Sequence, residues 1–209
     1  MISMEGVMPG GPGVVPGPAE RDHESLAGVR RVSVIGNAGS GKSTLARALA
    51  ARLGVPHVEL DGIYHQPDWI PLAEDELVRR VGAAAAGDGW VIDGNYSAIR
   101  ALVWARADTV VWLDPPRRVV MRRLIWRTIR RVISRTELWN GNREPWQNLV
   151  RRDPQMSVIA WAWHQHAAYQ QRYTAAALDP AWAHLRFSRV TSRREVRSLL
   201  DRARPCPRG

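Results

Sequence analysis

Short apolar runs alternate with amphipathic segments from residue 30 onward. The apolar runs predict β-strands over 30–36, 57–61, 90–94, 108–114 and 184–190. Between them, apolar residues recur at a helical spacing, and the helices are expected over 42–53, 74–85, 97–106, 116–134 and 154–177. Strands that alternate with helices indicate a parallel sheet covered on both faces. We therefore expect an α/β fold, doubly wound around that sheet.

Two sequence signals mark helix starts. Asp114 precedes two prolines, and we interpret it as the N-cap of the 116–134 helix rather than as a site residue. Ser192 followed by Glu195 is a capping box that opens a last helix. Residues 136–152 show no periodicity and are expected to be loop.

The two ends of the chain differ from its middle. Residues 1–29 are rich in Pro and Gly, so we expect a disordered tail followed by one domain over 30–209. The N-terminus lacks the basic and apolar regions of a signal peptide, and no apolar run approaches the ~18 residues of a membrane span. The single cysteine, Cys206, excludes an internal disulfide and a cysteine-based metal site. We expect a cytoplasmic protein without membrane contact.

The charge of the chain has an unusual composition. The net charge is +10, and of the 30 basic residues one is Lys, which leaves 29 Arg. We interpret this as a coding bias under which Arg replaces Lys wherever the two are interchangeable. They are not interchangeable where a compact ammonium group is needed. The surviving Lys42 therefore marks a position with a specific chemical demand.

Lys42 lies in a segment that matches the phosphate-binding loop, or P-loop, G-x-x-x-x-G-K-[ST]. The segment follows a predicted strand and opens a predicted helix, which is the context that a P-loop requires. The alternative interpretation is a plain glycine-rich turn before a helix. In a P-loop the backbone N–H groups point at phosphate oxygens, the Lys reaches the β- and γ-phosphates, and the Ser hydroxyl binds Mg²⁺. The expected ATP-binding residues are Gly36, Asn37, Ala38, Gly39, Ser40, Gly41, Lys42, Ser43 and Thr44.

Carboxylates stand at the ends of predicted strands, where open parallel sheets bind ligands. Asp93 follows a buried run and suits a magnesium role beside Ser43. Asp61 is placed to orient or deprotonate an acceptor hydroxyl. The alternative for both is a turn residue before Gly.

Aromatic and histidine residues leave two interpretations open. Tyr64, His65 and Trp69 could contact an acceptor, or Trp69 could simply fasten a loop. His164 and His166 point about 200° apart on a helix, so they cannot share a metal ion. We assign the tryptophans beside them to the core.

Residues 117–152 hold eleven Arg and two acidic residues, Glu137 and Glu144. On the 116–134 helix, one face carries Arg123, Arg127, Arg130 and Arg131. The opposite face carries Met121, Ile125, Ile129 and Val132, which we expect in the core. We interpret 117–152 as a lid whose catalytic candidates are Arg123, Arg127 and Arg131. An arginine placed over the γ-phosphate stabilises the charge of phosphoryl transfer. Nucleic acid is the rival ligand for such a face.

The stretch VIGNAGSGKSTLARALAARLGVPHVELDGIYHQPDW, with WVIDGNYS, ADTVVWLDPPR, the arginine helix and LWNGNRE, resembles a known family. This family is the small bacterial P-loop proteins labelled topology modulation protein, which are grouped with adenylate-kinase-like nucleotide kinases. The resemblance spans about residues 30–200. It implies a five-stranded parallel sheet of order 2-3-1-4-5, ATP at Gly36–Thr44 and Mg²⁺ near Ser43.

The resemblance also shows where this chain departs from adenylate kinases. Those enzymes carry Asp-Gly-Phe-Pro-Arg, whereas this chain has Asp93-Gly94-Asn95-Tyr96-Ser97, with the nearest arginine at Arg100. The placement of Asp61 resembles kinases that act on shikimate or gluconate. We predict an ATP- and Mg²⁺-dependent phosphotransferase acting on a small acceptor, a nucleotide or a hydroxyl metabolite. The alternative is a nucleotide-switched regulator that binds nucleic acid. The oligomeric state stays open.

Overall fold

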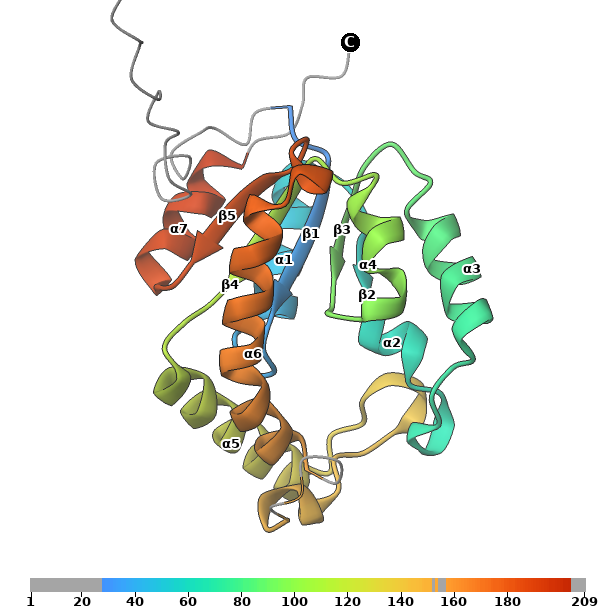
Figure 1. The fold of residues 1–209 in the computed structure, drawn as a ribbon. Helices are drawn as coiled ribbons and strands as arrows, with labels where there is room; N and C mark the ends of the chain where they lie inside the picture. The colour runs from blue at the N-terminus through green and yellow to red at the C-terminus, as the bar shows by residue number, and fades with distance from the viewer. Residues whose placement is uncertain (1–27, 152, 154–156, 204–209) are drawn as a thin grey trace, which may run out of the picture.

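The computed structural model describes residues 28–151, 153 and 157–203. Its centre is one five-stranded sheet of order β2-β3-β1-β4-β5, in which every pairing is parallel (Figure 1). The strands are β1 (Arg31–Gly36), β2 (His57–Glu59), β3 (Trp90–Asp93), β4 (Thr109–Leu113) and β5 (Arg186–Val190). The expected α/β class, parallel sheet and strand order are confirmed.

Helices cover both faces of the sheet. The α-helices are α1 (Lys42–Leu53), α2 (Leu60–Tyr64), α3 (Glu74–Ala84), α4 (Ser97–Trp104), α5 (Arg117–Ser134), α6 (Val158–Leu178) and α7 (Arg193–Arg202). Short 3₁₀ turns are η1 (Pro67–Trp69), η2 (Trp139–Gly141), η3 (Trp146–Leu149) and η4 (Pro180–Trp182). Helices α1 and α7 share one hydrophobic cluster with the sheet, while α3, α4 and α6 share the other. The sheet is thus doubly wound.

Alternation along the central strands explains this double covering. In β4, Val110 and Trp112 belong to the cluster under α3, α4 and α6, while Val111 and Leu113 belong to the cluster under α1 and α7. Successive side chains of a strand point to opposite faces, so a strand that is apolar at every position requires cover on both. The central strands β1, β3 and β4 therefore form the core.

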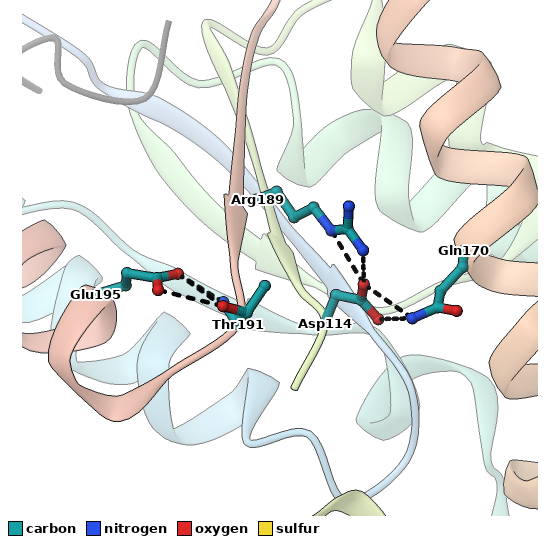
Figure 2. Close-up of polar contacts among 5 residues, drawn as sticks. All are labelled: Asp114, Gln170, Arg189, Thr191 and Glu195. Atoms are coloured by element: carbon teal, nitrogen blue, oxygen red, sulfur yellow. Dashed lines mark hydrogen bonds and ion pairs between the residues drawn. The ribbon is translucent and has the colours of Figure 1, made fainter. Parts of the chain in front are cut away.

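The prediction that Asp114 caps the following helix is wrong. Helix α5 begins at Arg117 with Pro116 at its N-cap, and no side chain caps it. Instead the buried Asp114 carboxylate accepts hydrogen bonds from Arg189 of β5, with Nη2 2.6 Å from Oδ2, and from Gln170 of α6 (Figure 2). Because Asp114 lies two residues before the N-cap position, its carboxylate takes a charged donor from the neighbouring strand.

The capping box at α7 is confirmed. Ser192 is the N-cap, and its Oγ accepts a hydrogen bond from the Glu195 backbone N–H at 3.2 Å. The Glu195 carboxylate reaches back one residue further than the usual motif and accepts from the backbone N–H of Thr191 at 2.8 Å (Figure 2). These bonds satisfy N–H groups at the start of the helix, including one that the first turn leaves without a helical partner.

One strand boundary and one helix face also differ from expectation. Strand β2 ends at Glu59, so Asp61 lies in α2 rather than at a strand end. Helix α5 turns Val120, Met121, Leu124 and Thr128 inward, whereas Ile125 is exposed and Ile129 and Val132 are half-buried. The expected core face was therefore rotated by part of a turn, because α5 packs against the P-loop and α6 rather than on the sheet.

In helix α6, the expectation for one tryptophan is wrong. Trp161 packs against the core as expected, but Trp163 is 48% exposed, with the Arg117 guanidinium 4.1 Å above its ring. His166 is buried and His164 is exposed, and the residues described by the structure hold no metal-binding cluster of His, Cys, Asp or Glu. Expectations for residues 1–27 and for Cys206 lie outside the described residues, but Val29 is already buried in the core.

No helix within the described residues has the length and hydrophobicity required to cross a membrane.

Asp108 fastens the amino ends of β1 and β4 together. Its Oδ2 accepts from the backbone N–H groups of Arg30 and Arg31 at 3.0 and 2.8 Å, and its Oδ1 lies 2.9 Å from Nη2 of Arg31. Burial alone would raise the pKa of Asp108, but these hydrogen bonds and the Arg31 charge outweigh it and hold the pKa below its ordinary value. The ionised form therefore stabilises the folded state.

We expect Asp108→Ala to lower the free energy of unfolding by about 1–3 kcal/mol at pH 7, because two backbone donors lose their acceptor. Urea denaturation measures this loss, with the exposed Asp88→Ala as the matched control. A carboxylate with a depressed folded pKa stabilises above its unfolded pKa of about 3.9, and this stabilisation disappears as the pH falls through the folded pKa. The gap between wild type and Asp108→Ala should therefore shrink at pH 3. A gap that is equal at pH 7 and pH 3 would contradict the assignment.

Candidate active site

The P-loop connects the end of β1 to the start of α1 at the carboxyl edge of the sheet. Gly36, Gly39 and Gly41 have φ angles of 149°, 82° and 105°, which side chains rarely tolerate. Gly41 is the N-cap of α1, so the amino end of a twelve-residue helix faces the loop. Backbone N–H groups and a helix amino end are a ready site for phosphate.

Three elements hold the P-loop in place. A Cβ on Gly39 would lie 2.8 Å from Cβ of Leu124, so the loop packs directly against α5. The buried Asn37 donates from Nδ2 to the Ala162 carbonyl of α6 at 2.7 Å. Asn95, after β3, pairs with both polar groups of the Gly36 backbone, accepting from its N–H at 3.1 Å and donating to its carbonyl. The loop is therefore prearranged by the fold.

Lys42 is the first residue of α1, and its side chain returns over the loop. Its Nζ lies 3.4 Å from the Asn37 carbonyl oxygen. Desolvation lowers the pKa of Lys42, while the carboxylates of Asp61 and Asp93 raise it and the Arg127 charge lowers it further. These four charged side chains come from α1, α2, β3 and α5, and the other three lie close enough for their charges to act on Lys42.

Asp93 ends β3 beside Ser43 of α1. The carboxylate is buried, and within the described chain neither of its oxygens has a hydrogen-bond partner, although His57 Nε2 lies 3.5 Å from Oδ1. Burial raises the pKa of Asp93, against the opposing effects of the Ser43 hydroxyl and the Lys42 charge. A buried carboxylate without a partner is costly unless a cation or a polar ligand joins it. Together with the Ser43 hydroxyl it is a hard oxygen donor set of the kind that Mg²⁺ prefers.

Asp61 lies on α2, and its charge acts on Lys42. Its Oδ1 accepts a hydrogen bond from the Tyr96 hydroxyl at 2.8 Å. Burial and the Asp61 charge raise the pKa of Tyr96, so the phenol remains a donor at neutral pH. This bond orients the Asp61 carboxylate and leaves Oδ2 for another group.

The three arginines expected in the lid have different environments. Arg123 donates to the Ser40 carbonyl of the P-loop at 3.0 Å. Arg131 Nη1 lies 3.4 Å from Glu144 Oε2, so this arginine has an acidic partner. Arg127 is half-buried, its Nε lacks a hydrogen-bond partner among the described residues, and desolvation and Arg131 lower its pKa. The charges of Glu144, Asp61 and Glu59 raise the pKa of the same guanidinium in turn, so Arg127 lies within electrostatic range of the Asp61 carboxylate.

The segment after α5 crosses to the acceptor side of the site. We call residues 138–143 the latch. Trp69 donates its backbone N–H to Asn142 Oδ1 at 2.9 Å and its indole N–H to the Arg143 carbonyl at 3.1 Å. The rings of His65 and Trp139 stack at 6.0 Å between centroids. Of the two interpretations of this region, the fastened loop is the one the contacts support.

The structure thus brings together most of the residues expected in the site. Lys42, Ser43, Asp61, Asp93 and Arg127 meet at the carboxyl edge, with the glycine loop beneath them. Thr44 is exposed in the first turn of α1, and Arg130 of α5 is exposed.

Sequence reasoning missed two kinds of residue. Asn95 and Tyr96 distinguish this chain from adenylate kinases, but no local pattern gave them a role, although each binds a site element. The latch was missed as well. Its Asn140-Gly141 pair, with φ angles of 56° and 79°, is a turn signal that was available in the sequence.

Comparison with known proteins identifies the fold. No family model matches the chain, and no curated protein matches it. Among solved structures it is similar to the shikimate kinase of Acinetobacter baumannii in complex with shikimate, with a TM-score of 0.51 and 14% identity over 84% of this chain and 91% of that one. It is also similar to the shikimate kinase of Bacteroides thetaiotaomicron, with a TM-score of 0.50 and 16% identity over 83% and 96%.

A gluconokinase from Sinorhizobium meliloti 1021 matches with a TM-score of 0.47 and 19% identity over 85% of this chain and 90% of that one. At these identities the similarity establishes the fold, which is that of P-loop kinases. The chain covers nearly the whole of both shikimate kinases.

We expect Lys42→Arg to weaken ATP binding about 10- to 100-fold, and Lys42→Ala to weaken it at least as much. A guanidinium is broader than an ammonium, and the Lys42 Nζ is desolvated and lies 3.4 Å from the Asn37 carbonyl oxygen. Loss of charged hydrogen bonds of this kind costs about 1.5–3 kcal/mol. Calorimetric titration with ATP measures the change. Wild-type affinity in Lys42→Arg would refute a specific demand for lysine at this position.

Proposed function

We propose that the protein is an ATP-dependent phosphotransferase that moves the γ-phosphoryl group to a hydroxyl of a small acceptor. The observation that carries the proposal is the convergence of Lys42, Asp61, Asp93 and Arg127 above a preformed P-loop. A phosphate-binding loop alone is common to many nucleotide-binding proteins. A carboxylate and an arginine that face it from two other elements are the additional groups that a transferase needs.

In this proposal each residue has a definite task. The P-loop amides and Lys42 bind the phosphates, while Ser43 and Asp93 would hold Mg²⁺, which when bound neutralises phosphate charge. Asp61 Oδ2 accepts the hydrogen bond of the acceptor hydroxyl, since Oδ1 is occupied by Tyr96. The acceptor oxygen forms its bond to the γ-phosphorus as the bond between that phosphorus and the bridging oxygen breaks. The hydroxyl proton passes to Asp61, and ADP leaves.

Arg127 stabilises the charge that spreads over the transferred group. Its partly desolvated guanidinium has a buried Nε that lacks a partner among the described residues, so an anion can complete its hydrogen bonding. Arg123 and Arg131 support the lid from either side, one on the P-loop carbonyl of Ser40 and the other on Glu144. We propose a hydroxyl-bearing metabolite rather than a nucleotide as the acceptor, and the similarity in fold to shikimate kinases supports this choice.

The acceptor test is a screen for ADP release from MgATP with hydroxylated carboxylic acids, sugars and nucleoside monophosphates. We expect one of the hydroxylated metabolites to stimulate release. In Asp61→Asn the stimulated rate should fall about 10²- to 10⁴-fold while ATP affinity is retained, because the change removes the proton acceptor and leaves the P-loop intact. A normal stimulated rate in Asp61→Asn would reduce Asp61 to a structural residue of α2.

A second prediction separates the lid from a nucleic-acid interface. Arg127→Ala should lower the transfer rate about 10³-fold or more with little loss of ATP affinity, since its contact strengthens in the transition state. Arg130→Ala is the matched control, because Arg130 is exposed one turn away on the same helix. Single-turnover kinetics measure both variants.

The alternative function predicts the reverse pattern. If the exposed arginines of α5 bind nucleic acid, Arg130→Ala should weaken DNA binding. It should also reduce the logarithmic salt slope by about 0.9 for each phosphate that the protein no longer neutralises. Competitor-resistant DNA binding together with unchanged kinetics in Arg127→Ala would favour the nucleotide-switched regulator.

A further inference from the structure

The latch joins the lid to the acceptor side by several side-chain hydrogen bonds. Asn140 donates from Nδ2 to the carbonyl oxygens of Gly62 and His65 at 3.2 and 2.6 Å. The buried Asn142 donates to the Gln66 carbonyl at 2.8 Å and accepts from the Trp69 N–H at 2.9 Å. Each asparagine therefore connects the latch, within the lid, to the segment that follows Asp61.

The latch is a compact turn rather than an extended loop. The Leu138 N–H donates to the Asn142 carbonyl at 2.7 Å, and the Asn142 N–H donates to the Trp139 carbonyl at 3.1 Å. Glu137 and Arg143 form an antiparallel bridge at its base. A turn closed in this way transmits displacement, because its backbone cannot stretch without losing these bonds.

Both ends of the latch contact residues next to proposed site residues. The turn follows α5 directly, where the Thr136 N–H donates to the Arg131 carbonyl at 3.2 Å. At the other end, Trp139 packs against Gly62, where a Cβ would be 2.9 Å from its Cδ1. Gly62 adjoins Asp61 in the chain. The latch thus lies between α5, which carries Arg127, and α2, which carries Asp61; the segment after α5 runs from that helix toward α2 (Figure 1).

We propose that Asn140 and Asn142 are positioning residues that hold the Asp61 turn to the lid, so that nucleotide binding at the P-loop is transmitted to the acceptor side. The inference rests on the proposed function, since it concerns the same site. An anion bound between Lys42 and Arg127 pulls Arg127 and the lid toward the P-loop. The latch then moves α2 together with the lid. Asp61 and Arg127 then take their places together, before the acceptor is bound.

The test is hydrogen exchange with and without Mg²⁺ and a non-hydrolysable ATP analogue. In wild type we expect the analogue to slow amide exchange in residues 60–70. In Asn142→Ala the Trp69 amide should exchange about 5- to 10-fold faster, as for the loss of one hydrogen bond. Residues 60–70 should also no longer respond to the analogue, although its affinity, measured by calorimetry, stays within about twofold of wild type.

Asn148→Ala is the control for Asn142→Ala. Asn148 lies in the lid a few residues beyond the latch. Its side chain donates to Glu144 rather than to residues 60–70, so the response should be retained. If Asn142→Ala fails to fold, Asn140→Gly keeps the left-handed backbone and removes only the side-chain donor, with the same expected loss of response.

The outcomes separate the two proposals. Failure of wild type to bind the analogue would overturn the proposed function. Binding without a response in 60–70, or an undiminished response in both latch variants, would overturn the positioning role and leave the phosphotransferase function standing.

Discussion

The contact between the glycine loop and helix α5 is the constraint on which the site depends. Gly39 has no side chain, and a single Cβ there would clash with Leu124 and with the Val120 carbonyl. Because the backbone of the loop lies against the helix, Arg127, about one turn further along α5, is held within electrostatic range of Lys42. The same loop is tied to α6 by Asn37 and to the end of β3 by Asn95. Phosphate binding and lid position are thereby determined by one packing arrangement.

Electrostatics explains why this arrangement is poised for a ligand. Lys42, Asp93 and Arg127 lie in a partly desolvated site, and burial and neighbouring charges shift the pKa of each of these three groups. Asp93 and the Nε of Arg127 are buried polar groups whose hydrogen bonding the described chain leaves incomplete. Such groups are costly in a folded protein, and they concentrate where a ligand completes them. In this protein these incompletely hydrogen-bonded groups lie at the carboxyl edge of the sheet, where parallel α/β folds bind their ligands.

The arginines of α5 divide by environment rather than acting as one charged stripe. Arg123, Arg127 and Arg131 turn toward the P-loop, the site and Glu144, whereas Arg130 remains exposed. Trp126 and Ile133 are exposed on the same helix, at 67% and 78%. The arginines of this helix therefore form two groups. The inner group faces the site and its supporting residues, and the outer group faces solvent. The helical wheel placed Arg130 in the inner group and misjudged the apolar face, because it carries no information on what packs against each side.

Sequence alone determined the features that depend on neighbouring residues. The α/β alternation, the P-loop and the capping box at Ser192 each follow from local spacing, since strand pleat, glycine backbone and helix start are set within a few residues. Asp114 shows where that reasoning ends. The neighbouring residues predict a helix cap, but the carboxylate instead pairs with an arginine 75 residues away in the chain. The latch is of the same kind, because Asn142 and Trp69 meet only after the chain has folded. Long-range partners of polar groups are decided by tertiary packing, which no local pattern encodes.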